Sequence, residues 1–386
     1  MLKSFKYSIN SRKMLKYFVR QIIMRVKDIQ DLKTFYFSIV NSSAMCLKNN
    51  NFTDNWDSNR FGVRDPGYNK NFAYELNEFT GSIKELFQVF RMLSDEYSKE
   101  LFFSYLCYRM VGHTAVKISS DWEKRIAATT SFNQVAQNSK TESVLNMLDY
   151  NGNKLNHYDF IWESTRYLID CINLTHILGM GQYYYDRNNI RIAPETGDYI
   201  IDGGAFLGDT ACIFSNSVGE KGKVYAFDPL DGHCDVIRHN FNQLDIDNCV
   251  LFQYGLSNTT NIEDLAALPK IRIDQCAPGF SLANNPKISL PLVSLDHLLA
   301  KGDIERIDFI KLDIEGSELN ALKGATEVIQ KFKPKLAISL YHKPNDLHEI
   351  PLYISSNFSF YSLYIDHYTI HQEELVLYCM PNLEKD

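Results

Sequence analysis

A glycine-rich turn with flanking acids is the sequence feature best suited to holding a ligand. Residues 202–210 read D-G-G-A-F-L-G-D-T and follow a short apolar run. This order predicts a buried strand that ends at Asp202, a close backbone approach over the paired glycines, and a helix that opens at Gly208. Ligands of open α/β sheets bind at the carboxyl ends of the strands. The residues of this turn predicted to bind a cofactor are Asp202, Gly203, Gly204, Ala205, Gly208, Asp209 and Thr210.

The spacing of the glycines separates two classes of cofactor. A dinucleotide fold uses G-x-G-x-x-G, whereas residues 202–208 give D-G-G-x-x-x-G. A carboxylate at Asp202 would attract the ammonium and sulfonium groups of S-adenosyl-L-methionine and would repel a pyrophosphate. The order therefore favours S-adenosylmethionine over NAD. A turn with a purely structural role is the alternative.

A second acid closes the next predicted strand, in the sequence V-Y-A-F-D-P over residues 224–229. Asp228 could accept hydrogen bonds from both ribose hydroxyls of an adenosine ligand, or it could instead cap the helix that follows. Gly255 and Asn258 end the third predicted strand, where backbone groups could read the adenine edge. These three residues complete the predicted cofactor site.

The block I-K-L-D-I-E-G-S-E over residues 310–318 places three acids and a lysine at the end of a strand. Asp313 and Lys311 are predicted to be functional, because buried charges persist mainly when they are paired or used. Asp313 is one candidate for the base that takes a hydroxyl proton, and His342 is the other. Glu318 is interpreted as a structural residue at the start of the following helix. Asp313 and Glu315 alone are thin evidence for a metal, and no metal ligands are assigned.

The elements that must position these residues follow from periodicity. After about residue 190, short β-branched runs alternate with helical stretches, which is typical of parallel strands joined by helices. The sequence predicts two final strands that pair as an antiparallel hairpin. Strands are expected near 198–202, 223–227, 249–254, 306–312, 335–341, 358–365 and 374–380, and helices near 208–217, 231–243 and 317–331.

The N-terminal part, residues 1–180, is predicted to be mainly helical. Residues 11–32 form a basic amphipathic pattern that could contact a membrane surface or a partner, or pack on its own domain. Residues 82–112 are helical in pattern, and residues 48–80 are expected to be an irregular connection. Short helices are expected over 140–150 and 157–179. Residues 259–305 are expected to be an insertion that could cap an acceptor pocket.

Composition limits the class of protein. The 386 residues are 45% hydrophobic and 23% charged, which excludes wholesale disorder. The chain has a net charge of −7. Residues 1–33 carry a local charge of +7, so the remaining residues carry −14. Such an acidic body argues against nucleic-acid binding. The eight cysteines are scattered singly, and neither a signal peptide nor a membrane-spanning run is found. A cytoplasmic protein is expected.

Taken together, these motifs resemble the FkbM family of S-adenosylmethionine-dependent methyltransferases. The resemblance rests on D-G-G-A-x-x-G-D-T, on F-D-P, on L-V-S-L-D at 292–296 and on I-K-L-D-I-E-G-S-E-x-x-x-L-K-G-A at 310–325. It covers roughly residues 180–380 and implies a Rossmann-like seven-stranded sheet, mostly parallel. Asp228 stands where the family often has Glu. The resemblance thus implies a domain over 181–386 that methylates hydroxyls of sugars, glycolipids or natural products.

Three classes of function remain at this stage. The first is an O-methyltransferase of a surface glycan, as in polysaccharide biosynthesis, or of a small glycosylated metabolite. The second is a scaffold whose cofactor-binding domain has no turnover, and the third is a nicotinamide oxidoreductase. The sequence identifies neither the acceptor nor the oligomeric state.

Overall fold

The chain forms two compact units in the computed structural model. One unit consists of Met1–Glu123 with Leu363–Leu375, and the other of Lys124–Ser362 with Val376–Asp386. This division differs from the predicted one near residue 180. Most of the predicted basic helix over 11–32, and residues 261–289 of the predicted insertion, lie outside the described residues. The structure describes residues 26–52, 55, 72–118, 122–145, 147, 153–260 and 290–382.

The first unit is built from helices that pack around aromatic side chains. Asp31 caps one helix by accepting the backbone N–H of Thr34 at 2.8 Å, and Asp95 caps another by accepting that of Ser98 at 2.8 Å. The buried ring of Phe35 lies 5.1 Å from that of Phe90. The helices are α2 (Leu32–Asn49), α4 (Phe72–Gly81), α5 (Ile83–Met92) and α6 (Glu96–Val111).

The helical pattern predicted over 82–112 is confirmed and consists of the two helices α5 and α6. Between them Leu93 bridges to Leu363, and the N–H of Ser94 donates to the carbonyl of Leu363 at 2.8 Å. One other prediction for this unit needs correction. The segment predicted as an irregular connection contains α4, in which the aromatic Phe79 is buried. Burial of that ring favours a packed helix over a solvated loop.

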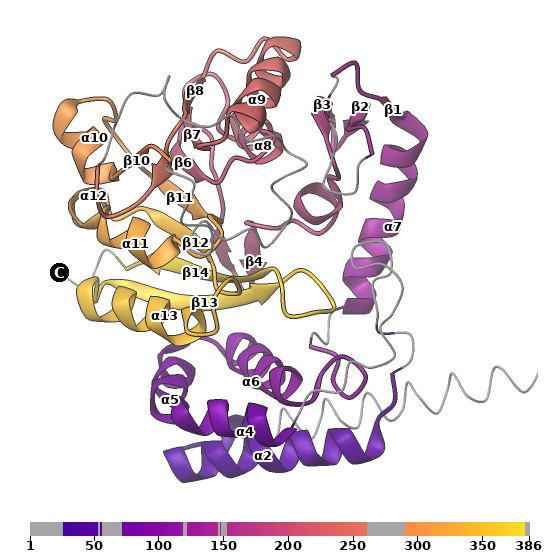
Figure 1. Ribbon diagram of the computed structural model, residues 1–386, viewed down its shortest axis with the longest axis vertical. Coiled ribbons are helices and arrows are strands. Elements are labelled where there is room, and N and C mark those ends of the chain that lie inside the picture. The colour runs from indigo at the N-terminus through magenta and orange to yellow at the C-terminus, as the bar shows by residue number, and fades with distance from the viewer. Residues whose placement is uncertain are drawn as a thin grey trace, which may run out of the picture. The chain divides into compact units, whose positions relative to one another are not determined.

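The seven-stranded sheet belongs to the second unit apart from most of β13, because residues 363–375 are part of the first unit. Its order is β13-β14-β12-β11-β6-β7-β8, with parallel pairing from β12 to β8 and antiparallel pairing of β12 with β14. Figure 1 shows these strands among the helices of the second unit. The strands are β6 (Tyr199–Gly203), β7 (Lys223–Phe227), β8 (Cys249–Phe252), β11 (Phe309–Leu312), β12 (Lys335–Ser339), β13 (Tyr361–His367) and β14 (Leu375–Pro381). The predicted Rossmann-like fold with a C-terminal hairpin is confirmed.

Helices alternate with these strands, as the sequence predicts. Helix α8 begins after Gly208, whose φ of +84° suits glycine, and the helix predicted over 317–331 is divided at Gly324. Two short strands, β9 (Gly255–Leu256) and β10 (Leu292–Val293), pair in parallel. The helices are α8 (Asp209–Val218), α9 (Asp231–Gln243), α10 (Leu295–Lys301), α11 (Glu318–Lys323), α12 (Thr326–Phe332) and α13 (Asp346–Asn357).

The region before the sheet differs from the prediction. Instead of helices over 140–150 and 157–179, it holds a three-stranded antiparallel sheet and a single π-helical turn. Glu163 and Ser164 have φ of 47° and 69°, and two such residues form a tight hairpin turn that the periodicity did not reveal. The elements are α7 (Trp122–Ser139), β1 (Lys140–Glu142), β2 (Asn156–Trp162), β3 (Thr165–Cys171), the π-helix η1 (Thr175–Gly179), β4 (Tyr185–Arg187) and β5 (Ile190–Ile192).

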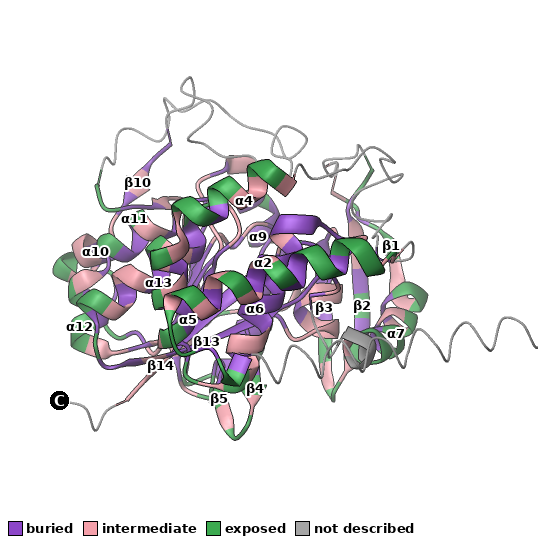
Figure 2. Cartoon of the chain, turned by 90° about the horizontal axis from the view of Figure 1, so that it is seen from below, coloured by how far each residue is buried: buried purple, intermediate pink, exposed green. Residues whose placement is uncertain are grey.

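The core follows the strands. All four residues of β11 are buried, as expected for a parallel strand that is covered on both faces. Figure 2 shows buried positions concentrated on strands, with exposed positions on outward faces of helices such as α2 and α7. Within the described residues, none of the helices combines the length and the apolar character that crossing a bilayer requires.

Candidate active site

The glycine turn lies where the strand order changes direction. From β6 the chain continues to β7 and β8 on one side, and then crosses to β11 and β12 on the other side. The carboxyl ends of β6 and β11 therefore meet at a topological switch point, which is where open α/β sheets bind ligands. The predicted cofactor turn and the block at 310–318 are brought together there.

Gly204 lets the turn close tightly against the end of β11. Its φ is +78°, and a Cβ added to it would lie 1.9 Å from the backbone oxygen of Asp313. On the other side, the N–H groups of Gly204 and Ala205 donate to the carbonyl of Phe227 at 3.0 and 2.9 Å. The turn is thus held between β7 and β11 by backbone contacts that no side chain at position 204 would allow.

Asp202 is oriented differently from the prediction. Its side chain is fully buried, and one carboxylate oxygen accepts the hydroxyl of Thr210 at 2.6 Å. The other oxygen lies 3.1 Å from Nζ of Lys311, its register partner on the neighbouring strand. Internal partners therefore take the carboxylate that was expected to face the ammonium of a cofactor. Asp202 therefore stabilises the glycine turn through contacts within the protein.

Lys311 contacts the glycine turn, and its predicted catalytic role stays a prediction. Its buried Nζ donates to the carbonyls of Gly203 and Gly204 at 3.1 and 2.8 Å. Burial alone would lower the pKa of Lys311, but the carboxylates of Asp202 and Asp313 outweigh burial and raise it. These carboxylates therefore favour the charged ammonium. It anchors the turn.

Asp228 connects the end of β7 to the glycine turn. One carboxylate oxygen accepts the N–H of Phe206 at 3.1 Å, and the other accepts the N–H of Leu230 and Nδ1 of His233, each at 3.0 Å. The N-cap of α9 is Leu230, so Asp228 bonds to the cap residue and is not itself the N-cap that the sequence allowed. A carboxylate offers about four acceptor positions, and three are in use here. About one position is left for a ligand.

Two further residues of the predicted site lie at the start of α8. Gly208 packs closely on α9, because a Cβ added to it would meet the backbone of Ile237 at 3.2 Å. Asp209 is buried in the first turn, and burial raises its pKa to about 6, although the nearby Lys311 ammonium acts in the opposite direction. These residues shape the end of the turn.

Gly255 lies close to the second-strand acid, whereas Asn258 is not placed there. A Cβ added to Gly255 would be 3.8 Å from Cγ of Pro229, the residue after Asp228. Asn258 is exposed, and its side-chain oxygen accepts the hydroxyl of Ser257 at 3.3 Å. The structure records no contact of Asn258 with the acid. Its predicted role in reading adenine stays a prediction.

Three side chains, two of them hydrogen-bond donors, surround Asp313 at the end of β11. Asp313 accepts the hydroxyl of Tyr183 at 2.6 Å and that of Tyr341 at 3.1 Å, and Nε2 of His342 lies 3.2 Å from it. Its side chain remains 20% exposed. Asp313, Lys311 and His342 are the three predicted catalytic residues. Of these, Asp313 is the one that combines a carboxylate with partial exposure to solvent.

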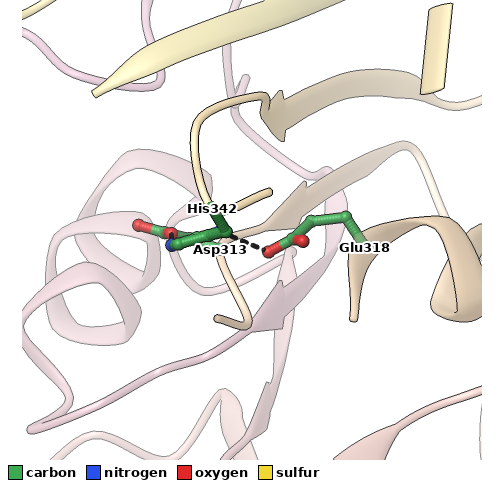
Figure 3. A group of neighbouring side chains, drawn as sticks. All are labelled: Asp313, Glu318 and His342. Carbon is green, nitrogen blue, oxygen red and sulfur yellow. Dashed lines mark hydrogen bonds and ion pairs between the residues drawn. The ribbon is translucent and has the colours of Figure 1, made fainter. Parts of the chain in front are cut away.

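His342 lies between two carboxylates (Figure 3). Its Nδ1 is 2.9 Å from Oε1 of Glu318, a buried carboxylate that also accepts the N–H of Ile314 at 2.8 Å. Burial alone would lower the pKa of His342, but Glu318, Asp313 and Glu315 outweigh it and raise the pKa to about 10. The same pairing holds the pKa of Glu318 below its usual value despite burial. This corrects the prediction that His342 is a base near neutral pH.

We expect His342 to remain an imidazolium at pH 8 when the buffer contains EDTA. A raised folded-state pKa stabilises the fold fully below pH 6.5, and this contribution is lost as pH rises through about 10. The stability of wild type relative to His342→Gln should therefore decline over that range. Urea unfolding measures the difference, and NMR of the imidazole nitrogens measures the protonation. A His342 signal that titrates near its ordinary value would contradict the assignment.

Sequence reasoning missed several partners of the site. Tyr183 is 130 residues from Asp313 along the chain, and nothing in its local sequence points to the contact. His233 follows Asp228 by five residues, on the helix that was correctly expected there. Glu318 was interpreted as a structural residue at the start of a helix. Its carboxylate accepts the N–H of Ile314, which precedes helix α11, and its contact with His342 was not foreseen.

Comparisons with known proteins agree with this geometry. The family description "Methyltransferase FkbM domain" matches residues 202–360. Hexuronic acid methyltransferase AglP of Haloferax volcanii is 28% identical over 137 residues, which cover 35% of this chain and 53% of AglP. The chain thus spans about half the length of this curated relative.

Solved structures are also similar. The methyltransferase FkbM from Methylobacillus flagellatus KT matches with a TM-score of 0.49 at 18% identity, covering 80% of this chain and 62% of that one. A SAM-dependent methyltransferase from Aquifex aeolicus matches with a TM-score of 0.32 at 17% identity, covering 49% and 85%. The motifs, the sheet order and the family match point the same way: residues 202–360 form an FkbM methyltransferase domain.

Proposed function

We propose that this protein transfers the methyl group of S-adenosylmethionine to a hydroxyl of a sugar, a surface glycan or a glycosylated metabolite. The observation that carries the proposal is the glycine turn that Gly204 closes against Asp313 at the switch point of an FkbM domain. The sugar as acceptor is supported by the similarity to AglP, whose name describes a hexuronic acid methyltransferase. A cytoplasmic location and a role in polysaccharide biosynthesis are part of this proposal.

The residues present fit the cofactor. Asp228 keeps about one acceptor position, which would take a ribose hydroxyl. Gly203 and Gly204 add no side chains to the turn, so its backbone can approach a ligand closely. Next to Asp228, the buried Nε2 of His233 has no hydrogen-bond partner among the described residues, which suits a site that receives a polar ligand. S-adenosylmethionine, when bound, supplies an electrophilic methyl group.

Asp313 is the base in this proposal. Lys311 and His342 are held in their charged forms, so neither accepts a proton at neutral pH. The hydroxyls of Tyr183 and Tyr341 fix the orientation of the Asp313 carboxylate, and about two of its four acceptor positions remain, one of which would take the hydroxyl of the acceptor. Alignment of that hydroxyl with the methyl group would provide much of the rate, and removal of its proton the rest.

Calorimetry with S-adenosylhomocysteine tests the cofactor site. We expect saturable binding to wild type, and a loss of about 10- to 100-fold in affinity for Asp228→Ala, because a hydrogen bond to a carboxylate contributes about 1.5–3 kcal/mol. Asp235→Ala is the matched control, since this exposed acid lies on the same helix, α9. No binding to wild type, or equal binding to Asp228→Ala, would contradict the proposal.

Two alternatives are separated by further measurements. A nicotinamide oxidoreductase would bind NADH in a fluorescence titration and would not bind S-adenosylhomocysteine. A scaffold would bind S-adenosylhomocysteine without methylating any acceptor in a mixture of sugars and glycans. Mass spectrometry of glycans from a deletion strain, in search of a lost methyl group, tests the enzyme and its acceptor together.

A further inference from the structure

The two edges of the His342 imidazole face different carboxylates. Nδ1 contacts Oε1 of Glu318 at 2.9 Å, whereas Nε2 lies 3.2 Å from Oδ1 of Asp313 and 3.7 Å from Oε2 of Glu315. Figure 3 shows Asp313 and Glu318 on opposite sides of the ring. One ion cannot contact both ring nitrogens, so Glu318 and Asp313 have different roles.

Glu318 determines which ring nitrogen is the donor. Its Oε1 accepts the N–H of Ile314 at 2.8 Å as well as the Nδ1 contact, so the carboxylate acts as an acceptor throughout. In the neutral ring the proton therefore lies on Nδ1, and Nε2 presents its lone pair. A carboxylate that holds the far nitrogen in this way is the usual support of a metal-binding histidine.

The Nε2 edge needs a positive charge. The His342 side chain is 6% exposed, and its Nε2 is buried without a hydrogen-bond partner among the described residues. The Asp313 oxygen is near, but it lies off the direction in which the ring would donate. Two carboxylates close to Nε2 favour a positive charge there, which is the ring's own proton when no metal is bound, or a metal ion that displaces this proton.

The distances suit a shared ion. Donor atoms about 2.1 Å from one ion lie roughly 3.0 Å apart at octahedral angles and roughly 3.4 Å apart at tetrahedral angles. The separation of 3.2 Å between Nε2 and Asp313 falls between these values, and the 3.7 Å between Nε2 and Glu315 is slightly wider. One imidazole and two carboxylates form a mixed nitrogen and oxygen set, which suits first-row transition ions such as Mn²⁺ or Zn²⁺ better than Ca²⁺.

We propose that His342, Asp313 and Glu315 bind a divalent transition-metal ion, and that Glu318 positions the histidine for it. The carboxylates of Asp313 and Glu315 each lie within 4.0 Å of Nε2 of His342. The assignment of ligands does not depend on methyl transfer. If the proposed function holds, the ion lies beside the turn that would bind the cofactor, where it would lower the pKa of an acceptor hydroxyl.

Manganese titration of the whole chain tests this proposal. Loss of the electron paramagnetic resonance signal of free Mn²⁺ should show one ion bound per wild-type chain. Affinity should fall at least about tenfold in His342→Gln, Asp313→Asn and Glu315→Gln, and about 10- to 100-fold in Glu318→Gln, which loses only the support of the ring. His239→Gln is the matched control, because His239 lies beside a buried carboxylate elsewhere in the unit, 3.5 Å from Asp170.

A second measurement uses wild-type protein alone, so its result does not depend on whether the variants fold. In wild-type protein labelled at histidine, substoichiometric Mn²⁺ should broaden the NMR signals of His342 before those of His239. The proposal is overturned if wild type binds neither Mn²⁺ nor Zn²⁺ more tightly than about 1 mM, or if His342→Gln and Asp313→Asn bind as wild type does, which would show an adventitious ion only. Calorimetry with S-adenosylhomocysteine on the same samples separates a failure of this site from a failure of the cofactor site.

Discussion

Replacing Gly204 with alanine should lower the free energy of unfolding by about 3–5 kcal/mol, near the upper end for a single substitution. Two effects add. The new Cβ would lie 1.9 Å from the backbone oxygen of Asp313, so the ends of β6 and β11 would have to separate. An L-residue at φ +78° also costs about 1–2 kcal/mol. Urea unfolding followed by circular dichroism measures the loss, and binding of S-adenosylhomocysteine should disappear with it.

Gly197→Ala is the matched control for this prediction. Gly197 has a φ of +88° in the same unit, but a Cβ added to it would have no neighbour within 4 Å. The variant should show only the backbone strain, about 1–2 kcal/mol. Equal losses for the two variants would mean that the close approach to Asp313 contributes nothing, and that the turn is not held as described.

Lys311→Met should be similarly severe, at about 3–5 kcal/mol, because it leaves the carboxylate of Asp202 buried without its cation. The side chains of the pair are 2% and 0% exposed, so water cannot replace the lost partner. The carbonyls of Gly203 and Gly204 also lose their donor. Unfolding in urea gives the stability, and calorimetry with S-adenosylhomocysteine reports whether the turn keeps its shape.

A double variant separates loss of the ion pair from loss of packing. Asp202→Asn removes the unpaired charge, so Asp202→Asn/Lys311→Met should be more stable than Lys311→Met alone. Arg306→Met is the control for an exposed pair: Arg306 is 54% exposed, lies 2.9 Å from Asp308, and should cost no more than about 1 kcal/mol. A double variant less stable than Lys311→Met would show that charge burial is not the cause.

The sequence by itself located the residues of the site that are consecutive along the chain. The turn at 202–208, the acid at Asp228 and the block at 310–318 each end a strand, and parallel strands carry such ends to one edge of a sheet. Helix α9 was predicted with its observed bounds because its apolar positions recur at helical spacing. Local order of this kind depends on neighbours within a few residues, which the sequence displays.

Tertiary structure decided which of these charges remain available. Asp202 and Lys311 are 109 positions apart in sequence, yet they face each other in register on adjacent strands and neutralise each other. His342 was predicted to titrate near neutral pH. The carboxylates of Glu318 in α11 and of Asp313 after β11 instead raise its pKa and favour the protonated ring. The strands over 156–171 were likewise not predicted from the sequence, because their pairing depends on a two-residue turn with positive φ. The charge state of a buried group is set by the partners that folding brings to it, and those partners are not its neighbours in the chain.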